Sequence, residues 1–136
     1  MNALGHAHPL TRGLPSSFKI MQWHHAEVTK LPAGAEVLDL PREAVAGMRS
    51  ASEPYAMLLA RTVRERFGAT WGVSETGAAG PNGNGYGDAS GHSCIAISGP
   101  VEFVMTLETG SDDRVANMEA FAAGVLDLLA RVTAED

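Results

Sequence analysis

The sequence predicts an α/β fold in which helices pack on a small mixed sheet. Two segments, 52–67 and 113–132, carry apolar residues at the three- and four-residue spacing of amphipathic helices. Short apolar runs bounded by Gly and Pro give the element order strand, helix, strand, hairpin, helix. This order is typical of a sheet covered by helices. The 136 residues suffice for one domain that buries about two thirds of its unfolded surface.

The N-terminal third is predicted to hold a tail followed by a strand hairpin. Residues 1–17 offer Pro, Gly and Ser without an apolar period, so we expect a loop or tail there. Strands are predicted at 18–23 and 36–40, separated by a Pro- and Gly-containing turn. We therefore assign a strand hairpin to residues 18–44 and the remaining elements to a unit that spans 45–136.

Residues 52–67 form the first predicted helix, with signals at both ends. Ser52 is placed to cap the N-terminus, Glu53 suits the positive end of the helix dipole, and Pro54 is tolerated in the first turn. Gly68 stands where a helix commonly ends in a left-handed residue. The predicted buried stripe consists of Tyr55, Leu58, Leu59, Thr62, Val63 and Phe67.

Three further strands are predicted in the middle of the chain. The first covers residues 70–75 and leads into a glycine-rich segment. The next two, 93–98 and 101–108, are separated only by Gly99-Pro100, which predicts a tight turn and an antiparallel hairpin.

The last predicted helix covers residues 113–132, with Asp112 as its cap. Arg114 lies in its first turn, where the helix dipole disfavours a cation. We expect Arg114 either to meet an anionic ligand or a buried carboxylate, or to pair on the surface with a neighbouring aspartate or Glu108. The predicted buried stripe consists of Met118, Phe121, Ala122, Val125, Leu129 and Val132.

The glycine-rich segment carries the clearest functional signal, because six of the fifteen glycines fall between residues 77 and 91. Glycines at this density allow positive φ and let backbone N–H groups approach an anion or a carbonyl oxygen. The segment lacks the Gly-Lys-Ser/Thr of a P-loop and the glycine spacing of a dinucleotide fingerprint. A loop at the carboxyl end of a strand is a favoured ligand position, so we expect binding here; a flexible surface loop is the alternative.

Metal and nucleophile motifs are weak. The candidate ligands lie on separate elements without zinc-site spacing, so we predict no metal and no cofactor; they are His6, His8, His24, His25, His92 and Cys94. His92 and Cys94 are expected to share one face of a strand as ordinary strand residues. Ser16 and Lys19 have serine–lysine spacing but sit at a loop-to-strand junction, not on the helix that this chemistry uses.

Charge, apolar runs and the cysteine count together indicate which partners and which cellular compartment to expect. The net charge of -6, from 16 acidic and 10 basic residues, disfavours nucleic acid as a partner. No apolar run approaches the ~20 residues of a membrane span, and the N-terminus lacks the apolar core of a signal peptide. A single cysteine cannot form an internal disulfide. We therefore expect a cytoplasmic protein with no membrane partner.

Several short motifs occur in a fixed order between about residues 45 and 132. They are Ser52-Glu53, Arg66-Phe67-Gly68-Ala69-Thr70-Trp71-Gly72-Val73, Thr76-Gly77-Ala78-Ala79-Gly80-Pro81, Cys94-Ile95-Ala96-Ile97 and Arg114-x-x-Asn117-Met118. In sequence and order this set resembles the later half of the C-terminal domain of competence/damage-inducible protein A (CinA), a family that includes nicotinamide-nucleotide amidases. The implied fold is therefore an incomplete form of that family's three-layer α/β domain.

The resemblance implies hydrolysis of the amide of nicotinamide mononucleotide to nicotinate mononucleotide and ammonia, without a metal. It places the Thr76–Pro81 loop over the substrate, where backbone N–H groups would face the developing oxyanion, and Arg114 near the substrate's charged group. The substrate-binding residues that it implies are Thr76, Gly77, Ala78, Gly80, Pro81 and Arg114.

The family's nucleophile motif, Glu-Ser-Cys/Thr-Gly-Gly, does not occur in the sequence, and neither Tyr55 nor Tyr86 matches the context of the family's tyrosine. No catalytic residue is therefore assigned, and we expect impaired hydrolysis. A non-catalytic binding or oligomerisation module is the alternative. A homodimer is expected, because half of the family's sheet would expose an edge that invites pairing with a second copy.

A second resemblance covers residues 9–40, which are similar to the late strand pair of class I glutamine amidotransferase domains. It is carried by the segments Pro15–Val28 and Leu31–Leu38. That family's Gly-x-Cys-x-Gly and His-Pro-Glu motifs are absent, so we expect no glutamine hydrolysis and assign no catalytic role to His24 or His25.

Overall fold

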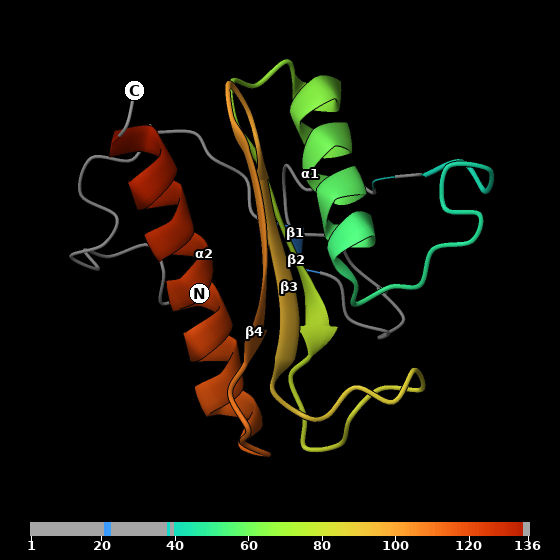
Figure 1. Ribbon diagram of the computed structural model, residues 1–136, viewed down its shortest axis with the longest axis vertical. Helices are drawn as coiled ribbons and strands as arrows, with labels where there is room; N and C mark the ends of the chain where they lie inside the picture. Colours follow the sequence, from blue (N-terminus) through green and yellow to red (C-terminus); the bar gives the residue numbers. More distant parts are fainter. Residues whose placement is uncertain (1–20, 23–37, 39, 135–136) are drawn as a thin grey trace, which may run out of the picture.

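Two helices pack on opposite faces of a four-stranded sheet in the computed structural model, which describes residues 21–22, 38 and 40–134 (Figure 1). The elements are β1 (Met21–Gln22), α1 (Glu53–Phe67), β2 (Gly72–Ala78), β3 (His92–Ser98), β4 (Glu102–Glu108) and α2 (Arg114–Ala134). The predicted α/β fold class is confirmed.

The sheet has the strand order β1-β2-β3-β4 and is mixed. β1 runs parallel to β2, whereas β2–β3 and β3–β4 are antiparallel pairs. The predicted hairpin around Gly99-Pro100 is therefore confirmed. The strand predicted at 36–40 lies largely outside the described residues, and Leu38 and Leu40, which are described, are not in a strand. The tail predicted over 1–17 lies outside the described residues altogether.

β3 lies at the centre of the core and is buried along its whole length. Its Ile95 and Ile97 face α2, where they pack with Val125 and Leu129. The alternate residues of β3 face α1, where the packing side chains are small, with Cys94 and Ala96 among them. The period of two along a strand explains why one strand serves both layers.

α1 lies much closer to the sheet than its predicted stripe implies. A Cβ on Gly72 would stand 2.0 Å from the carbonyl oxygen of Ala60, and Ser74 Oγ donates a hydrogen bond of 2.5 Å to the carbonyl oxygen of Ala56. The residues of α1 that are buried are accordingly Ala56, Leu59, Ala60 and Val63. Four residues of the predicted stripe, Tyr55, Leu58, Thr62 and Phe67, are only half-buried, because the small alanines occupy the close contact.

The predicted helix ends agree with the structure in position to within two residues, but the predicted caps agree only in part. Gly68 ends α1 with φ +57, as predicted, and Ser52 stands at the N-cap position of α1. The Ser52 hydroxyl, however, donates to the carbonyl oxygen of Arg49 and not to the helix. The cap of α2 is Asp113, one residue later than predicted, because its Oδ1 accepts hydrogen bonds of 3.0 Å from the amides of Val115 and Ala116.

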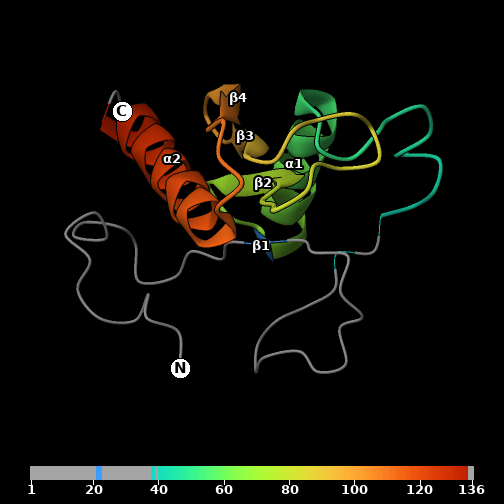
Figure 2. The same cartoon turned by 90° about the horizontal axis from the view of Figure 1, so that it is seen from below.

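β2 is longer than the strand predicted at 70–75. Thr76, Gly77 and Ala78 pair with Cys94, Ser93 and His92 of β3. Gly77 was predicted to belong to the glycine-rich loop, but it lies in β2. It packs so closely on β3 that a Cβ would stand 2.2 Å from the carbonyl oxygen of His92. The loop therefore begins at Ala79, and it lies at the same end of the molecule as the first turn of α2 (Figures 1 and 2). Neither described helix is long and apolar enough to cross a bilayer.

Candidate functional site

The six predicted binding residues come together at the end of β2. Thr76 and Ala78 are buried strand residues, Gly77 is an exposed strand residue, and Gly80 and Pro81 form the first part of the loop that follows. Arg114 lies on the first turn of α2, and its Nη1 donates a hydrogen bond of 2.8 Å to the carbonyl oxygen of Gly80. We predicted that Arg114 meets an anionic ligand or a buried carboxylate, or pairs on the surface with a neighbouring aspartate or Glu108. Its guanidinium is in contact with the backbone of the loop.

Asn117, also in the first turn of α2, holds the start of the same loop at Ala79. Its side chain is fully buried, and its Nδ2 donates 2.9 Å hydrogen bonds to the carbonyl oxygens of Ala79 and Ser111. Its Oδ1 accepts a hydrogen bond of 2.5 Å from Thr109. The sequence hypothesis did not assign a role to Asn117. The signal available was a polar residue four positions before Phe121, on the face of the helix that faces the core.

Gly80 adopts φ +104, a conformation that side chains rarely tolerate. A Cβ at this position would also stand 2.2 Å from Ser90 Oγ. Contacts to Arg114 and Asn117 therefore hold the loop in one conformation, in which Gly80 is the residue that the backbone requires. The predicted need for glycine is confirmed at this position.

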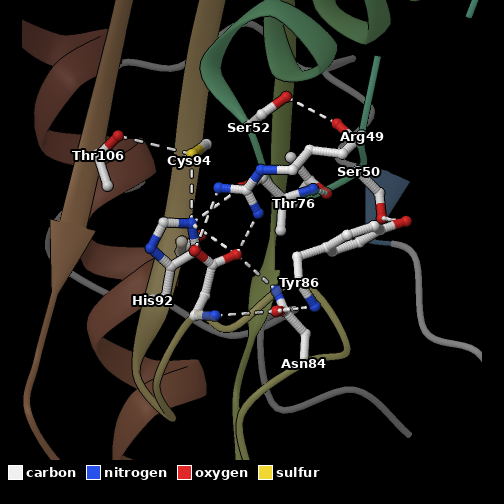
Figure 3. Close-up of polar contacts among 12 residues, drawn as sticks. Arg49, Ser50, Ser52, Thr76, Asn84, Tyr86, His92, Cys94 and Thr106 are labelled. Carbon is white, nitrogen blue, oxygen red and sulfur yellow. Dashed lines mark hydrogen bonds and ion pairs between the residues drawn. The ribbon is translucent and has the colours of Figure 1, made fainter. Parts of the chain in front are cut away.

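A second polar cluster joins the segment Arg49–Ser52 to the far end of the same loop (Figure 3). Arg49 binds the Asp88 carboxylate with both terminal nitrogens, at 2.5 Å and 3.1 Å. This hydrogen bond to Arg49 lowers the pKa of Asp88 to about 2, with a smaller contribution from Asn84. Arg49 also lies 5.4 Å from the ring centre of Tyr86, whose hydroxyl is 3.2 Å from Ser50 Oγ.

His92 lies at the centre of this second cluster, with both ring nitrogens near acceptors. Its Nδ1 contacts the carboxylate of Glu108, and its Nε2 lies 2.9 Å from the carbonyl oxygen of Ala51. Burial alone would lower the pKa of His92, but the hydrogen bonds to Glu108 and to Ala51, with the charges of Glu108 and Asp88, raise it above its ordinary value. His92 and Cys94 share one strand face, as predicted, with 3.7 Å between Nε2 and Sγ.

Ala51 links this cluster to the predicted binding residues. It is the one non-glycine residue of the described chain with positive φ, at 53°, and it is buried. Its amide donates a hydrogen bond of 3.1 Å to Oγ1 of Thr76, while its carbonyl oxygen faces His92. No sequence signal predicts a left-handed alanine, so sequence reasoning missed both Ala51 and the cluster around His92.

Cys94 is a poor candidate for a nucleophile, and the described residues form no metal site. Cys94 is buried, and burial raises the pKa of its thiol, although the hydrogen bond to Thr106 acts in the opposite direction. Across the described ranges, no group of three His, Cys, Asp or Glu side chains is arranged to hold a metal ion. Ser16, Lys19 and the four N-terminal histidines lie outside the described residues.

Comparisons with known proteins point to one family. The model of the CinA C-terminal domain matches residues 30–133. A CinA-like protein of Anaeromyxobacter sp. (strain K) is 39% identical over 93 residues, which is 67% of this chain and 23% of that protein. A CinA-like protein of Cytophaga hutchinsonii is 32% identical over 96 residues, which is 71% of this chain and 23% of that protein. The chain thus spans about a quarter of the length of these curated relatives.

Solved structures agree on the fold. A CinA superfamily protein from Escherichia coli superposes with a TM-score of 0.63 at 20% identity, over 70% of this chain and 55% of that one. A competence/damage-inducible protein from Agrobacterium tumefaciens gives 0.62 at 21% identity, over 68% and 58%. The family match begins inside the segment 9–40, whose resemblance to a glutamine amidotransferase stays a prediction.

Proposed function

Because the chain belongs to the CinA C-terminal domain family, we propose that it binds nicotinamide mononucleotide at the Thr76–Pro81 segment and does not hydrolyse it. The observation that carries this proposal is the fixed conformation of that segment, which Arg114 and Asn117 hold against the first turn of α2.

The chemistry of the groups at this end of the sheet supports the proposed binding. Asp113 caps the N-terminus of α2, so the positive group that a phosphate would meet is the guanidinium of Arg114. Gly77 is exposed and Gly80 is partly exposed, so the backbone beside that guanidinium is open to a small polar ligand. These features support a nucleotide that carries both a phosphate and an amide.

The placement of the candidate nucleophiles supports the proposed loss of hydrolysis. The Glu-Ser-Cys/Thr-Gly-Gly motif of the family does not occur in the sequence. Ser93 and Cys94 each lie beside a group that could act as a base, Glu75 and His92 respectively, but both side chains are buried. Neither is placed to attack a bound amide, since a nucleophile must reach its substrate.

Calorimetry and an ammonia assay on the same preparation test the two parts of the proposal. We expect measurable heat of binding for nicotinamide mononucleotide and no ammonia above the buffer blank. Arg114→Ala should weaken binding about tenfold, the effect of ~1.4 kcal/mol from one charge-assisted contact. Gly80→Val should abolish binding, because it forces the loop out of its conformation.

Arg131→Ala is the matched control, because Arg131 is exposed in the last turn of the same helix and should leave affinity unchanged. Absence of binding by the folded wild-type chain would refute the binding proposal. Ammonia release that Arg114→Ala and Gly80→Val abolish would refute the proposed loss of hydrolysis and would identify an active amidase.

A further inference from the structure

We propose that His92 is a protonation-dependent latch, which in its doubly protonated form ties Ala51 to the sheet and releases Ala51 when it loses a proton. The latch is distinct from nucleotide binding and needs no ligand. It rests on the placement of one buried ring between two acceptors that belong to different elements, Glu108 of β4 and Ala51 before α1.

The geometry requires two N–H groups on the ring. A carboxylate and a carbonyl oxygen can only accept hydrogen bonds, so both ring nitrogens must donate, which only an imidazolium does. The side chain of His92 is 7% exposed, so water does not replace a lost partner at little cost. A neutral ring can satisfy one of the two acceptors and not both.

One of the two ring nitrogens of His92, Nε2, is expected to lose its proton first. The bond from Nδ1 to the Glu108 carboxylate is charge-assisted and therefore stronger than the bond from Nε2 to a neutral carbonyl oxygen. The proton should leave Nε2, whose lone pair then faces the oxygen of Ala51 and repels it. The thiol of Cys94, 3.7 Å from Nε2, is placed to donate to the ring in that state.

The charged groups around the ring favour the latched form. Glu108 reaches His92 from β4, and Asp88 reaches it from the loop, with Oδ2 at 3.7 Å from Nε2. Arg49 is bound to Asp88, and Glu53 of α1 accepts a hydrogen bond from Thr106, which contacts Cys94. The two carboxylates nearest the ring are negative, and the one cation of the cluster is already paired with Asp88.

Release acts on Ala51, which is held in a strained conformation. A left-handed alanine is sterically strained and persists only where neighbours hold it. Two hydrogen bonds hold Ala51, one to Thr76 and one to His92. When the second is lost, the residue can relax, and the donor to Oγ1 of Thr76 moves away with it.

The hydrogen bonds of His92 determine whether the latch opens or closes as the pH rises. The pKa of His92 in the folded chain lies above its ordinary value of 6.5. The latch is therefore fully closed below about pH 6.5 and opens as the pH rises through the folded pKa. Ala51 should lose protection over that same interval.

Nuclear magnetic resonance on the full ¹⁵N-labelled chain tests the latch without any ligand. Ring spectra should show His92 with both nitrogens protonated at acid pH and with only Nδ1 protonated above the transition. The exchange protection factor of the Ala51 amide, corrected for intrinsic exchange, should fall about tenfold across the same transition, as expected for one buried hydrogen bond. Glu108→Gln should move both transitions to lower pH.

Glu119→Gln is the matched control, because it removes one exposed carboxylate of α2 and should leave the transition in place. The proposal is overturned if Ala51 protection stays constant while His92 titrates, or if the acid form of the ring carries one proton. It is equally overturned if Glu108→Gln folds and leaves the midpoint unchanged. If that variant does not fold, the wild-type titration decides alone.

Discussion

Gly77 and Gly80 are close in sequence but are required for different physical reasons. Gly77 lies in a strand, and the obstacle to a side chain is the backbone of β3, because a Cβ at Gly77 would stand 2.2 Å from the carbonyl oxygen of His92. Gly80 lies in the loop, and the obstacle is its own φ of +104 as well as Ser90. A dense run of glycines thus serves strand packing at one position and turn geometry at another.

Gly77→Ala should destabilise the chain by about 1–3 kcal/mol, because the added methyl group pushes β2 and β3 apart. Equilibrium unfolding in urea measures this change as a lower midpoint. Gly85→Ala is the control, since nothing lies within 4 Å of a Cβ at that position. Equal midpoints for the two variants would show that β2 and β3 do not approach each other as described at Gly77.

The Asp88–Arg49 ion pair predicts a loss of stability in acid. The pKa of Asp88 is about 2 in the folded chain and 3.8 ordinarily, so its stabilisation is complete above about pH 4 and is lost as the pH falls through 2. Asp88→Asn should therefore lower the free energy of unfolding at pH 5 and make little difference at pH 2. Urea unfolding over this pH range measures the difference.

Asp127→Asn, on an exposed position of α2, provides the control for Asp88→Asn. Its effect should be small and independent of pH. A constant difference between wild type and Asp88→Asn from pH 5 to pH 2 would contradict the ion pair.

At the scale of elements, α2 has two functions along its length. Its C-terminal half contributes Val125, Leu128 and Leu129 to the core that covers one face of the sheet. Its first turn contributes Arg114 and Asn117, which hold the loop after β2. The helix therefore connects the stability of the core to the shape of the candidate site.

Asn117→Ala should cost about 2–4 kcal/mol, because it leaves the buried carbonyl oxygen of Ala79 and the partly buried one of Ser111 without their donor. Thermal or urea unfolding measures the loss of stability. Glu119→Ala, two residues away and exposed, should change stability little. A cost for Asn117→Ala no larger than that for Glu119→Ala would show that Asn117 does not hold the loop.

For the molecule as a whole, the apolar periodicity of the sequence predicted the order and layers of the elements better than it predicted how closely α1 packs on the sheet. The two helices, the central hairpin and the mixed sheet follow from apolar spacing and from Gly-Pro punctuation. The close approach of α1 could not be read from its large apolar residues, because the contact is made by Ala56 and Ala60 over Gly72. Small residues carry no periodic signal of their own.

Residues of the candidate site could be proposed from the sequence where a motif lies in one segment. The contact of Arg114 with Gly80 of the Thr76–Pro81 motif was not predicted, and the binding role of these residues stays a prediction. The cluster around His92 was not predictable, because it joins residues from 49 to 108 through tertiary contacts alone.

The homodimer stays a prediction. Within the described chain, β4 pairs with β3 on one side only, and Phe103 of β4 is exposed.

Amide chemical-shift mapping with nicotinamide mononucleotide shows where on the chain the ligand binds, and it therefore decides whether the Thr76–Pro81 segment is the site. The proposed site predicts that the largest shifts occur at Gly77, Ala78, Ala79 and Gly80 and that they disappear in Gly80→Val. No shift at millimolar nucleotide, or shifts confined to residues away from this loop and the first turn of α2, would contradict it.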